Sequence, residues 1–323
     1  MPIPGITDLE QRLHDPYLYD IATYAAPADP ASPTHLLFQL DHNLYDARLD
    51  GTQLHRVPSA IPCDETFAVT PDGRWVACGN ADGIALIPLA SQTGEGSRQI
   101  VRNQDHDFEG YPAWAPDGQH LGVVNSMGGG CAIGIYAIQG DYATANLIAV
   151  LAFPQFATPD PPGARCGVTG LSWSPDGSWL TFQVRRPSGI LTLYGVQIAS
   201  VLPDLLRGSG DVNPSQVTTV PVSADVLLDL GETAQALAPT WRHAGHALAV
   251  TDPRGNTIVE VDRASRQQQT LLGSLPEHVC SSSWTPDDQH LVFLLCRQEG
   301  SLAAGPPPAQ PYIFTPSTAA SGA

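Results

Sequence analysis

Short runs of apolar residues, separated by turn-forming residues, recur along the whole chain. The runs at 121–124 and 291–295 are typical, since each is short, apolar and bounded by polar turn residues. Such runs are expected of β-strands that are buried on both faces. None approaches the roughly 18 consecutive apolar residues that mark a transmembrane helix. The pattern therefore predicts an all-β protein without membrane insertion.

One turn pattern accounts for the spacing of these runs. It places an aromatic or apolar residue before a turn of the Pro-Asp-Gly type, and its copies begin at Val69, Trp114, Trp173, Trp241 and Trp284. Three places after the last turn residue, every copy has an apolar residue: Val76, Leu121, Leu180, Leu248 and Leu291. Proline presets φ, aspartate hydrogen-bonds its own backbone, and glycine accepts a positive φ. We expect each copy to join two antiparallel strands, with its aspartate forming the turn rather than acting in catalysis.

Two copies depart from the pattern. In the copy that begins at Trp241, which is the fifth unit when the segment 35–49 is counted as the first, the turn at 243–245 lacks proline and aspartate but keeps its glycine. Asp288 stands where the last copy should have glycine, and Asp tolerates a left-handed backbone better than most residues.

Further strands complete each unit. Third strands are predicted at 84–87, 133–138, 191–194 and 257–261, and a weaker fourth strand follows, for example at 269–272. The units start roughly 43 to 68 residues apart, which is the period of a four-stranded propeller blade with insertions. The runs at 35–40 and 43–49 form one more unit that lacks an obvious first turn. The sequence therefore predicts a six-bladed β-propeller of four-stranded antiparallel blades.

The predicted propeller occupies residues 34–315, and the termini are expected to close its ring. The preceding segment, 1–33, contains a capping-box pattern at 7–10 that favours a short helix, and a strand-like run at 17–24. That run is expected in the same blade as 311–315 or directly beside it, because shared or adjacent ends remove free sheet edges. The tail 316–323 is predicted to be disordered.

The Trp-Ser-Pro-Asp-Gly signature at 173–177, followed by an apolar strand, resembles the TolB-like propellers, whose repeats also occur in the propeller domains of prolyl-oligopeptidase-type enzymes. The resemblance covers 34–315 and implies the fold rather than an activity. About 33 residues precede the first unit, so the α/β domain that TolB carries before its propeller is expected to be missing. The Trp-Asp dipeptide typical of WD repeats does not occur.

The charge of the chain limits its partners. The formal net charge is −17, and all 15 basic residues are arginine. Nucleic-acid binding is not expected, because it needs a basic surface. The absence of lysine excludes Schiff-base chemistry on the chain. The N-terminus shows no signal-peptide pattern, so the location stays open between the cytoplasm and, if a leader was removed, the periplasm or extracellular space.

The six cysteines form no Cys-x-x-Cys pair, which argues against a zinc ribbon or a thioredoxin motif. Cys78 and Cys296 fall in second strands, where a small buried apolar residue is the expected role. Cys131 and Cys166 lie near one rim of neighbouring blades, where a disulfide is an alternative.

The candidate site lies on the rim opposite the repeated turns. The residues proposed there for ligand binding are Asp64, Glu65, His106, Glu109, Arg165, Glu277 and His278. Four of them could converge at the mouth of the central channel: Asp64, Glu109, Glu277 and His278. Three carboxylates and one imidazole suit a divalent cation such as Ca²⁺, Mn²⁺ or Zn²⁺. The alternative is a solvated acidic rim without any cofactor.

No sequence signature supports nucleophilic catalysis. There is no Gly-x-Ser-x-Gly motif and no α/β-hydrolase segment follows the repeats, so oligopeptidase activity is not implied. We expect a non-catalytic binding module that uses its rim loops and channel mouth to bind a protein or a small ligand. The alternative is a metal-dependent hydrolase or lyase with an acidic site at the channel mouth.

Overall fold

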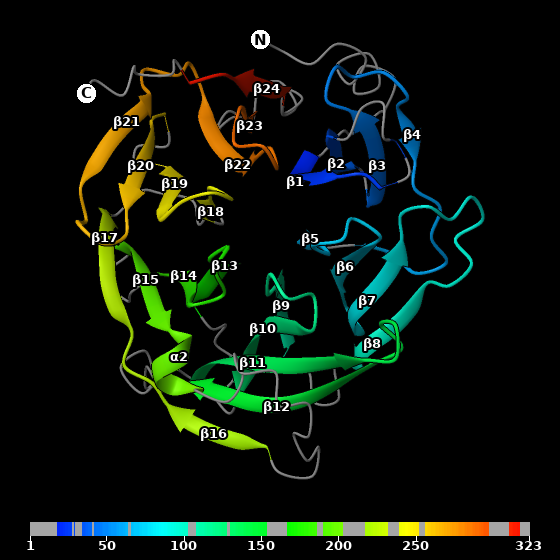
Figure 1. The fold of residues 1–323 in the computed structure, drawn as a ribbon, viewed down its shortest axis with the longest axis horizontal. Helices are drawn as coiled ribbons and strands as arrows, with labels where there is room; N and C mark the ends of the chain where they lie inside the picture. The colour runs from blue at the N-terminus through cyan, green and yellow to red at the C-terminus, as the bar shows by residue number, and fades with distance from the viewer. Residues whose placement is uncertain are drawn as a thin grey trace, which may run out of the picture.

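The computed structural model has six small, mainly antiparallel sheets arranged around a central axis (Figure 1). It describes residues 18–27, 29, 34–40, 42–63, 66–102, 108–127, 130–153, 167–185, 190–202, 217–231, 239–251, 256–296 and 310–316. The six-bladed propeller predicted from the repeats is thereby confirmed. The predicted short helix before residue 17 and the tail beyond residue 316 lie outside the described residues.

The first three blades follow one another along the chain. Blade 1 consists of β1 (Leu18–Ala25), β2 (Thr34–Leu40), β3 (Asn43–Arg48) and β4 (His55–Arg56). Blade 2 consists of β5 (Phe67–Val69), β6 (Trp75–Asn80), β7 (Gly83–Pro88) and β8 (Arg98–Arg102). Blade 3 consists of β9 (Phe108–Trp114), β10 (His120–Met127), β11 (Gly130–Gln139) and β12 (Thr144–Ala152).

Among the last three blades, blades 4 and 6 depart from four consecutive strands. Blade 4 consists of β13 (Val168–Trp173), β14 (Trp179–Arg185), β15 (Leu191–Gln197) and β17 (Asp225–Gly231), with the short α2 (Ile198–Val201) after β15. Blade 5 consists of β18 (Thr240–Trp241), β19 (Ala247–Thr251), β20 (Ile258–Asp262) and β21 (Gln268–Leu272). In its described residues, blade 6 consists of β22 (His278–Trp284), β23 (Leu291–Cys296) and β24 (Gln310–Phe314). From the blade 4 insertion, β16 (Thr218–Pro221) adds a fifth strand to blade 3, parallel to β12.

The ring closes between two neighbouring blades. The run predicted at 17–24 forms β1, the innermost strand of blade 1, and lies beside β22, the innermost strand of blade 6 (Figure 1). The Thr23 N–H donates to Ser283 Oγ at 3.0 Å, and the Thr23 hydroxyl donates to the Trp284 carbonyl. Of the two predicted arrangements, the structure therefore has the terminal segments in adjacent blades.

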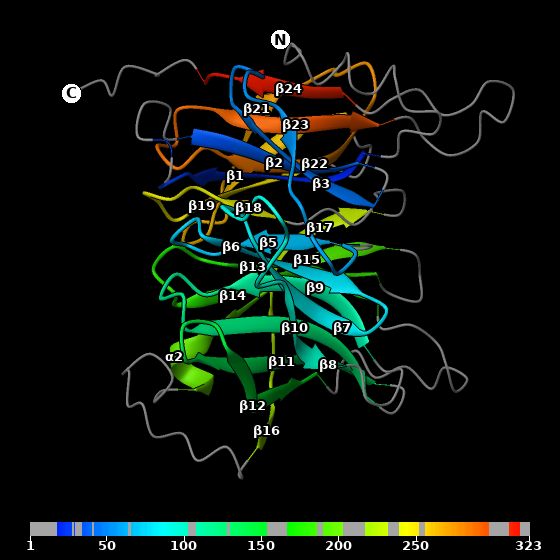
Figure 2. The same cartoon turned by 90° about the vertical axis from the view of Figure 1, so that its right-hand side faces the viewer.

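The repeated turns have the predicted geometry. In the second unit, the Gly73 N–H donates to the Thr70 carbonyl at 2.8 Å, and the Arg74 N–H donates to Asp72 Oδ1 at 3.0 Å. The φ of Gly73 is 68°, a left-handed value that glycine adopts without strain. Asp288, in the place of a turn glycine, adopts a φ of 56°. These turns all lie on one rim, here called the turn rim, which is at the left in Figure 2 and faces the viewer in Figure 1.

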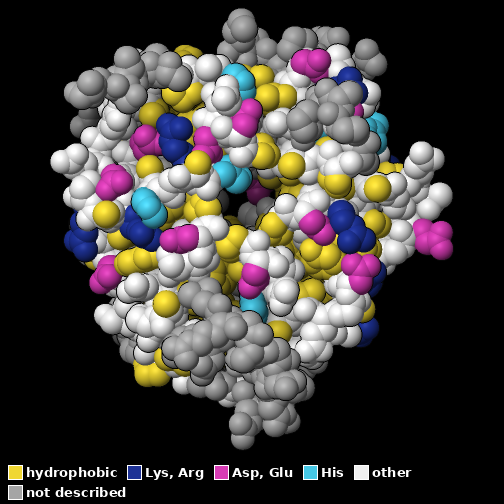
Figure 3. All heavy atoms as spheres, in the orientation of Figure 1, with side chains coloured by type: hydrophobic (Ala, Val, Ile, Leu, Met, Phe, Trp, Pro, Cys, Tyr) yellow, Lys and Arg dark blue, Asp and Glu magenta, His cyan; other side chains and the backbone are white. Residues whose placement is uncertain are grey.

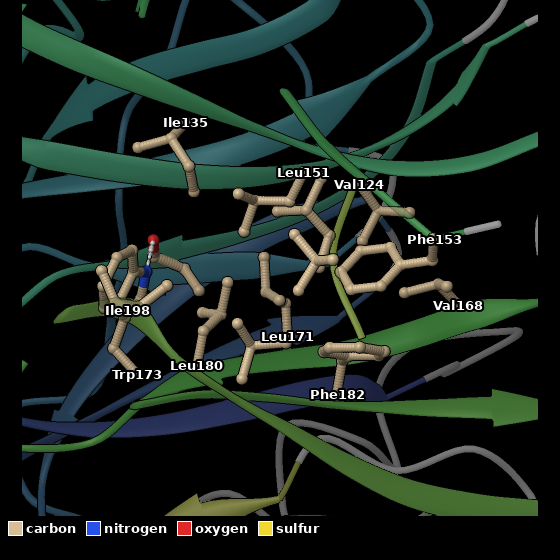
Figure 4. Packing of buried hydrophobic residues seen from close by; sticks show 14 of the residues in the cluster. Val124, Ile135, Leu151, Phe153, Val168, Leu171, Trp173, Leu180, Phe182 and Ile198 are labelled. Atoms are coloured by element: carbon tan, nitrogen blue, oxygen red, sulfur yellow. Dashed lines mark hydrogen bonds between the residues drawn. The ribbon is translucent and has the colours of Figure 1, made fainter. Parts of the chain in front are cut away.

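The repeated tryptophan is explained by the packing between blades. Trp173 of blade 4 is buried against blade 3, and its Nε1 donates to the Ala113 carbonyl at 3.1 Å (Figure 4). Trp114 makes the equivalent bond to the Ala68 carbonyl of blade 2 at 3.2 Å. Between blades 3 and 4, the rings of Phe153 and Phe182 pack with centroids 4.9 Å apart. Burial of each such side chain contributes roughly 1.5–3 kcal/mol.

One cysteine prediction is wrong. Cys78 is fully buried as expected, but its sulfur forms a disulfide with Cys63, with a Cα–Cα distance of 5.3 Å. The prediction failed because Cys63 lies in the connection that enters blade 2, and nothing in the spacing shows that this connection folds against β6. The side chains of Cys131, Cys166 and Cys296 lie outside the described residues.

Candidate functional site

The sequence-predicted site lies mostly outside the described residues. This applies to Asp64, Glu65, His106 and Arg165, and to the side chains of Glu109 in β9 and His278 in β22. Glu277 is half-buried and directly precedes β22, on the rim opposite the turns. Within the described part of the chain, no three ligating side chains gather in a way that could hold a metal ion. The proposed metal site therefore stays a prediction.

The aspartates of the repeated turns are engaged in the turns themselves. Asp176 Oδ1 accepts hydrogen bonds from the Ser174 hydroxyl at 2.5 Å and from the Ser178 N–H at 3.0 Å. Although burial opposes ionisation, these bonds hold the pKa of Asp176 at about 2. Asp117 and Asp287 make equivalent bonds, and their pKa values are also lowered. The prediction that these residues form turns is confirmed.

Aromatic rings and arginines gather on the turn rim between blades 2 and 3. The Arg98 guanidinium lies 4.5 Å from the centroid of the Trp75 ring. Its Nε and Nη2 donate to the carbonyls of Tyr142 and Asp141, both at 3.0 Å. The Tyr142 hydroxyl donates to Asp72 Oδ2 at 3.2 Å, and its pKa rises to about 12, first because of burial and then because of the Asp72 charge. Trp75, Arg98 and Tyr142 are only partly buried, so the cluster contributes to the surface.

A second such cluster joins blades 4 and 5. The Arg263 guanidinium lies 5.3 Å from the centroid of the Trp179 ring and donates to the Ser178 hydroxyl at 3.2 Å. It also lies 3.9 Å from Asp176 Oδ2. Trp179 and Arg263 are partly exposed, as in the first cluster. Both clusters place a cation–π pair on the turn rim.

A third pair joins blades 5 and 6, where the two irregular turns meet. The Arg242 guanidinium lies 4.0 Å from the centroid of the Trp284 ring and pairs with Glu260. The backbone N–H groups of His243 and Ala244 donate to the two carboxylate oxygens of Asp288, at 2.8 and 2.7 Å. The fifth unit, which lacks its own turn aspartate, therefore uses the aspartate of the sixth. Figure 3 shows acidic and basic side chains close together at several places on this rim, around a central opening.

A cavity of about 290 Å³ lies between blades 1 and 2. Its polar lining comes from His42, Asn43, Arg56 and Ser59, and one wall is the disulfide residue Cys63. The volume is at the lower limit of small-molecule sites.

Comparisons with known proteins agree on the fold. The family model described as "WD domain, G-beta repeat" matches residues 160–181. TolB from Acinetobacter baumannii has 20% sequence identity and a TM-score of 0.51, over 92% of this chain and 60% of that one. Putative TolB from Agrobacterium tumefaciens has 17% identity and a TM-score of 0.50, over 93% of this chain and 91% of that one. A chain of the mitotic checkpoint complex has 13% identity and a TM-score of 0.53, over 98% of this chain and 93% of that one. No curated protein matches the sequence significantly.

The fold is that of a TolB-like, WD-like β-propeller. At these identities the likeness concerns architecture alone, and the chain spans 60% of the length of the Acinetobacter TolB structure. No helix in the described part of the propeller is long and apolar enough to cross a membrane.

The clusters on the turn rim of this TolB-like, WD-like propeller were missed by sequence reasoning. One signal was available, because Trp75 and Trp179 each stand two residues after a turn glycine. The arginines give no such signal. Arg98 comes from the fourth strand of the same blade as Trp75, and Arg263 from a turn of the blade beside that of Trp179. Their positions relative to the tryptophans follow only from the pairing of strands and the packing of blades.

Proposed function

We propose that this propeller is a non-catalytic binding module that contacts a protein partner through its turn rim. The observation that carries the proposal is the presence of two partly exposed tryptophans, Trp75 and Trp179, each beside an arginine guanidinium. Tryptophan, tyrosine and arginine are the residues that most often dominate binding energy at protein interfaces. The propeller in the mitotic checkpoint complex, which is similar in fold, comes from a structure of a protein assembly.

The electrostatics of the rim also support a protein partner. Arg74 is exposed and lies 3.5 Å from Asp141, which is more exposed still. Exposed pairs of this kind contribute at most about 1 kcal/mol to stability. They are well suited to steering and orienting a partner with complementary charges, because opposite charges alternate along the surface.

The proposal is tested with charge reversals at the two ends of one blade. Arg74→Glu changes the turn rim, and Arg102→Glu is the matched control, because Arg102 is exposed at the opposite-rim end of β8. Cross-linked complexes recovered from the source cells with wild type, Arg74→Glu and Arg102→Glu are compared by mass spectrometry. We expect one partner to be lost from Arg74→Glu and retained by Arg102→Glu. A partner lost only from Arg102→Glu would place binding on the opposite rim and contradict the proposal, as would recovery of no partner by wild type.

A further inference from the structure

A carboxylate lies where the innermost strands of three blades meet. Asp20 is in β1, between β22 of blade 6 and β5 of blade 2 (Figure 1). Its Oδ1 accepts hydrogen bonds from the Ser281 hydroxyl at 2.7 Å and from the Ile21 N–H at 2.9 Å. The backbone N–H of Phe67 in β5 also stabilises its charge.

A β-bulge gives Asp20 this position. The register between β1 and β2 shifts between Leu18 and Ile21, so the residues between them do not follow the alternation of the strand. Bulges of this kind re-aim a side chain out of the regular pleat. Asp20 can thereby reach both neighbouring blades near the axis, and part of its surface stays accessible to solvent.

Among the described residues, the surroundings of Asp20 supply hydrogen bonds but no positive charge. Its partners are one hydroxyl and two backbone N–H groups, and no basic side chain of the described residues contacts it. Burial raises the pKa of Asp20 to about 6, against the opposing effect of these three donors. A cation placed beside a partly desolvated carboxylate gains more electrostatic energy than it would in bulk water. The net charge of −17 also favours entry of cations into a channel.

We propose that Asp20 anchors a binding site in the central channel for an organic cation, a guanidinium or ammonium group. One carboxylate is sufficient for such a group, which needs only hydrogen-bond acceptors and a negative charge. A divalent metal would need several ligating side chains, and within the described residues no such group is found. The opening at the centre of the turn rim in Figure 3 offers a route to the axis.

The test compares a cationic probe with its neutral isostere. N-acetyl-arginine amide and N-acetyl-citrulline amide are titrated into the full chain by calorimetry, together with a longer arginine-containing peptide. We expect the arginine probe to bind in the millimolar range at about pH 7.5 and about tenfold more weakly at about pH 5, because protonation of Asp20 competes with the cation. Binding of the small probe would assign the site to small cations, and binding of the peptide alone would assign it to an arginine of a protein.

The matched variants separate charge from structure. Asp20→Asn keeps an acceptor for Ser281 but removes the charge, and Asp50→Asn changes an exposed turn of the same blade. We expect Asp20→Asn to weaken the arginine probe at least tenfold and Asp50→Asn to leave it unchanged. Equal binding by wild type and Asp20→Asn, equal binding of the citrulline probe, or no binding of any probe would overturn the proposal.

A stability measurement shows that Asp20→Asn is folded and that Asp20 titrates as described. Its pKa in the fold, about 6, is above the value of 3.8 for an exposed Asp, so ionisation costs stability as pH rises from 3.8 to about 6. The free energy of unfolding of wild type should therefore fall relative to Asp20→Asn across that window. In the described part of β1, β2, β5 and β22, the other ionisable side chains are Tyr24 and His35, at the turn-rim ends of β1 and β2. The turn-rim partner and this channel site are tested by different variants, so either proposal can fail alone.

Discussion

The first hairpin of blade 1 and the first hairpins of blades 2 to 4 are stabilised by different interactions. In blades 2 to 4, a turn aspartate accepts hydrogen bonds from backbone and side-chain donors two to three residues away, as Asp72 and Asp176 do. In blade 1, which has no Pro-Asp-Gly turn, buried side chains take this role. His35 Nδ1 lies 2.9 Å from Asp46 Oδ2, and its Nε2 lies 3.2 Å from Asp29 Oδ2.

Two further residues complete this buried cluster in blade 1. The Tyr24 hydroxyl donates to Asp46 Oδ1 at 2.8 Å, and Arg48 Nε donates to Asp29 Oδ2 at 2.7 Å. His35 and Asp46 are each only 5% exposed. A local turn is redundant because its backbone bonds remain when the aspartate is lost, whereas each member of a buried charge cluster depends on the others. The two kinds of hairpin should therefore differ sharply in their sensitivity to mutation.

The largest effect is expected from Asp46→Ala. The substitution leaves the Tyr24 hydroxyl and the His35 ring buried without their main acceptor, which should lower the free energy of unfolding by about 3–5 kcal/mol. Chemical denaturation monitored by tryptophan fluorescence measures the change. Asp50→Ala is the control in the same blade, because Asp50 is exposed and bonds only within its turn. A much smaller loss than that of Asp46→Ala is expected there. Similar losses for the two variants would show that the cluster does not stabilise the hairpin.

The disulfide between Cys63 and Cys78 should have the next largest effect. It joins the connection entering blade 2 to β6 across a sequence separation of 15 residues. Cross-linking a loop of this size stabilises a protein by about 3 kcal/mol, mainly by restricting the unfolded chain. We expect the double substitution of Cys63 and Cys78 by alanine to shift the denaturation midpoint downward by a corresponding amount, and a reducing agent to shift wild type but not the variant. A variant with the midpoint of oxidised wild type would contradict this.

The two kinds of hairpin should also respond oppositely to pH. Hydrogen bonding to Asp46 is the main reason why the pKa of His35 is raised, with Asp29 adding to the effect and burial opposing it. His35 therefore stabilises the fold fully below its unfolded pKa of about 6.5, and this contribution is lost as pH rises through the raised value. Asp176, with a pKa of about 2, stabilises above 3.8 and loses this contribution as pH falls towards 2.

Two matched variants measure these contributions. The difference in unfolding free energy between wild type and His35→Gln should shrink as pH rises. The difference between wild type and Asp176→Asn should shrink as pH falls. A His35→Gln difference that grows with pH would mean that the ring is neutral in the fold, and the cluster would then owe its stability to hydrogen bonds alone.

The sequence predicts the parts of this propeller that are encoded locally. The turn glycine at 73 and the turn aspartate at 176 specify backbone geometry within a few residues. Five copies of the pattern, together with the strand runs at 35–40 and 43–49, therefore predict six blades. The cluster around His35 was not predictable, because Asp29 and Asp46 become neighbours of His35 only after β1, β2 and β3 pair. The same reason applies to Cys63 and Cys78, and to the arginine–tryptophan pairs on the turn rim. Of the candidate site residues, only Glu277 has a described side chain, so that prediction is untested.

The smallest effects are expected where the two irregular turns share one aspartate. Asp288→Gly removes the acceptor for the backbone N–H groups of His243 and Ala244, but it also relieves the left-handed backbone of Asp288, which costs about 1 kcal/mol for a residue with a side chain. The two terms oppose each other, so a net change of only a few tenths of a kcal/mol is expected from this substitution.

A double-mutant cycle measures the coupling between the two turns, which the single variant cannot show because its two opposing terms nearly cancel. Ala244→Asp gives the fifth unit an aspartate at its usual turn position, but in wild type the new carboxylate meets Asp288 and should destabilise the fold. In the Asp288→Gly background the same substitution restores a self-contained turn and should be neutral or stabilising. We expect the two sites to be coupled by about 1 kcal/mol, measured by thermal and chemical unfolding of the four proteins. Additive effects would mean that the two turns are independent, and that the missing aspartate of the fifth unit is not replaced by that of the sixth.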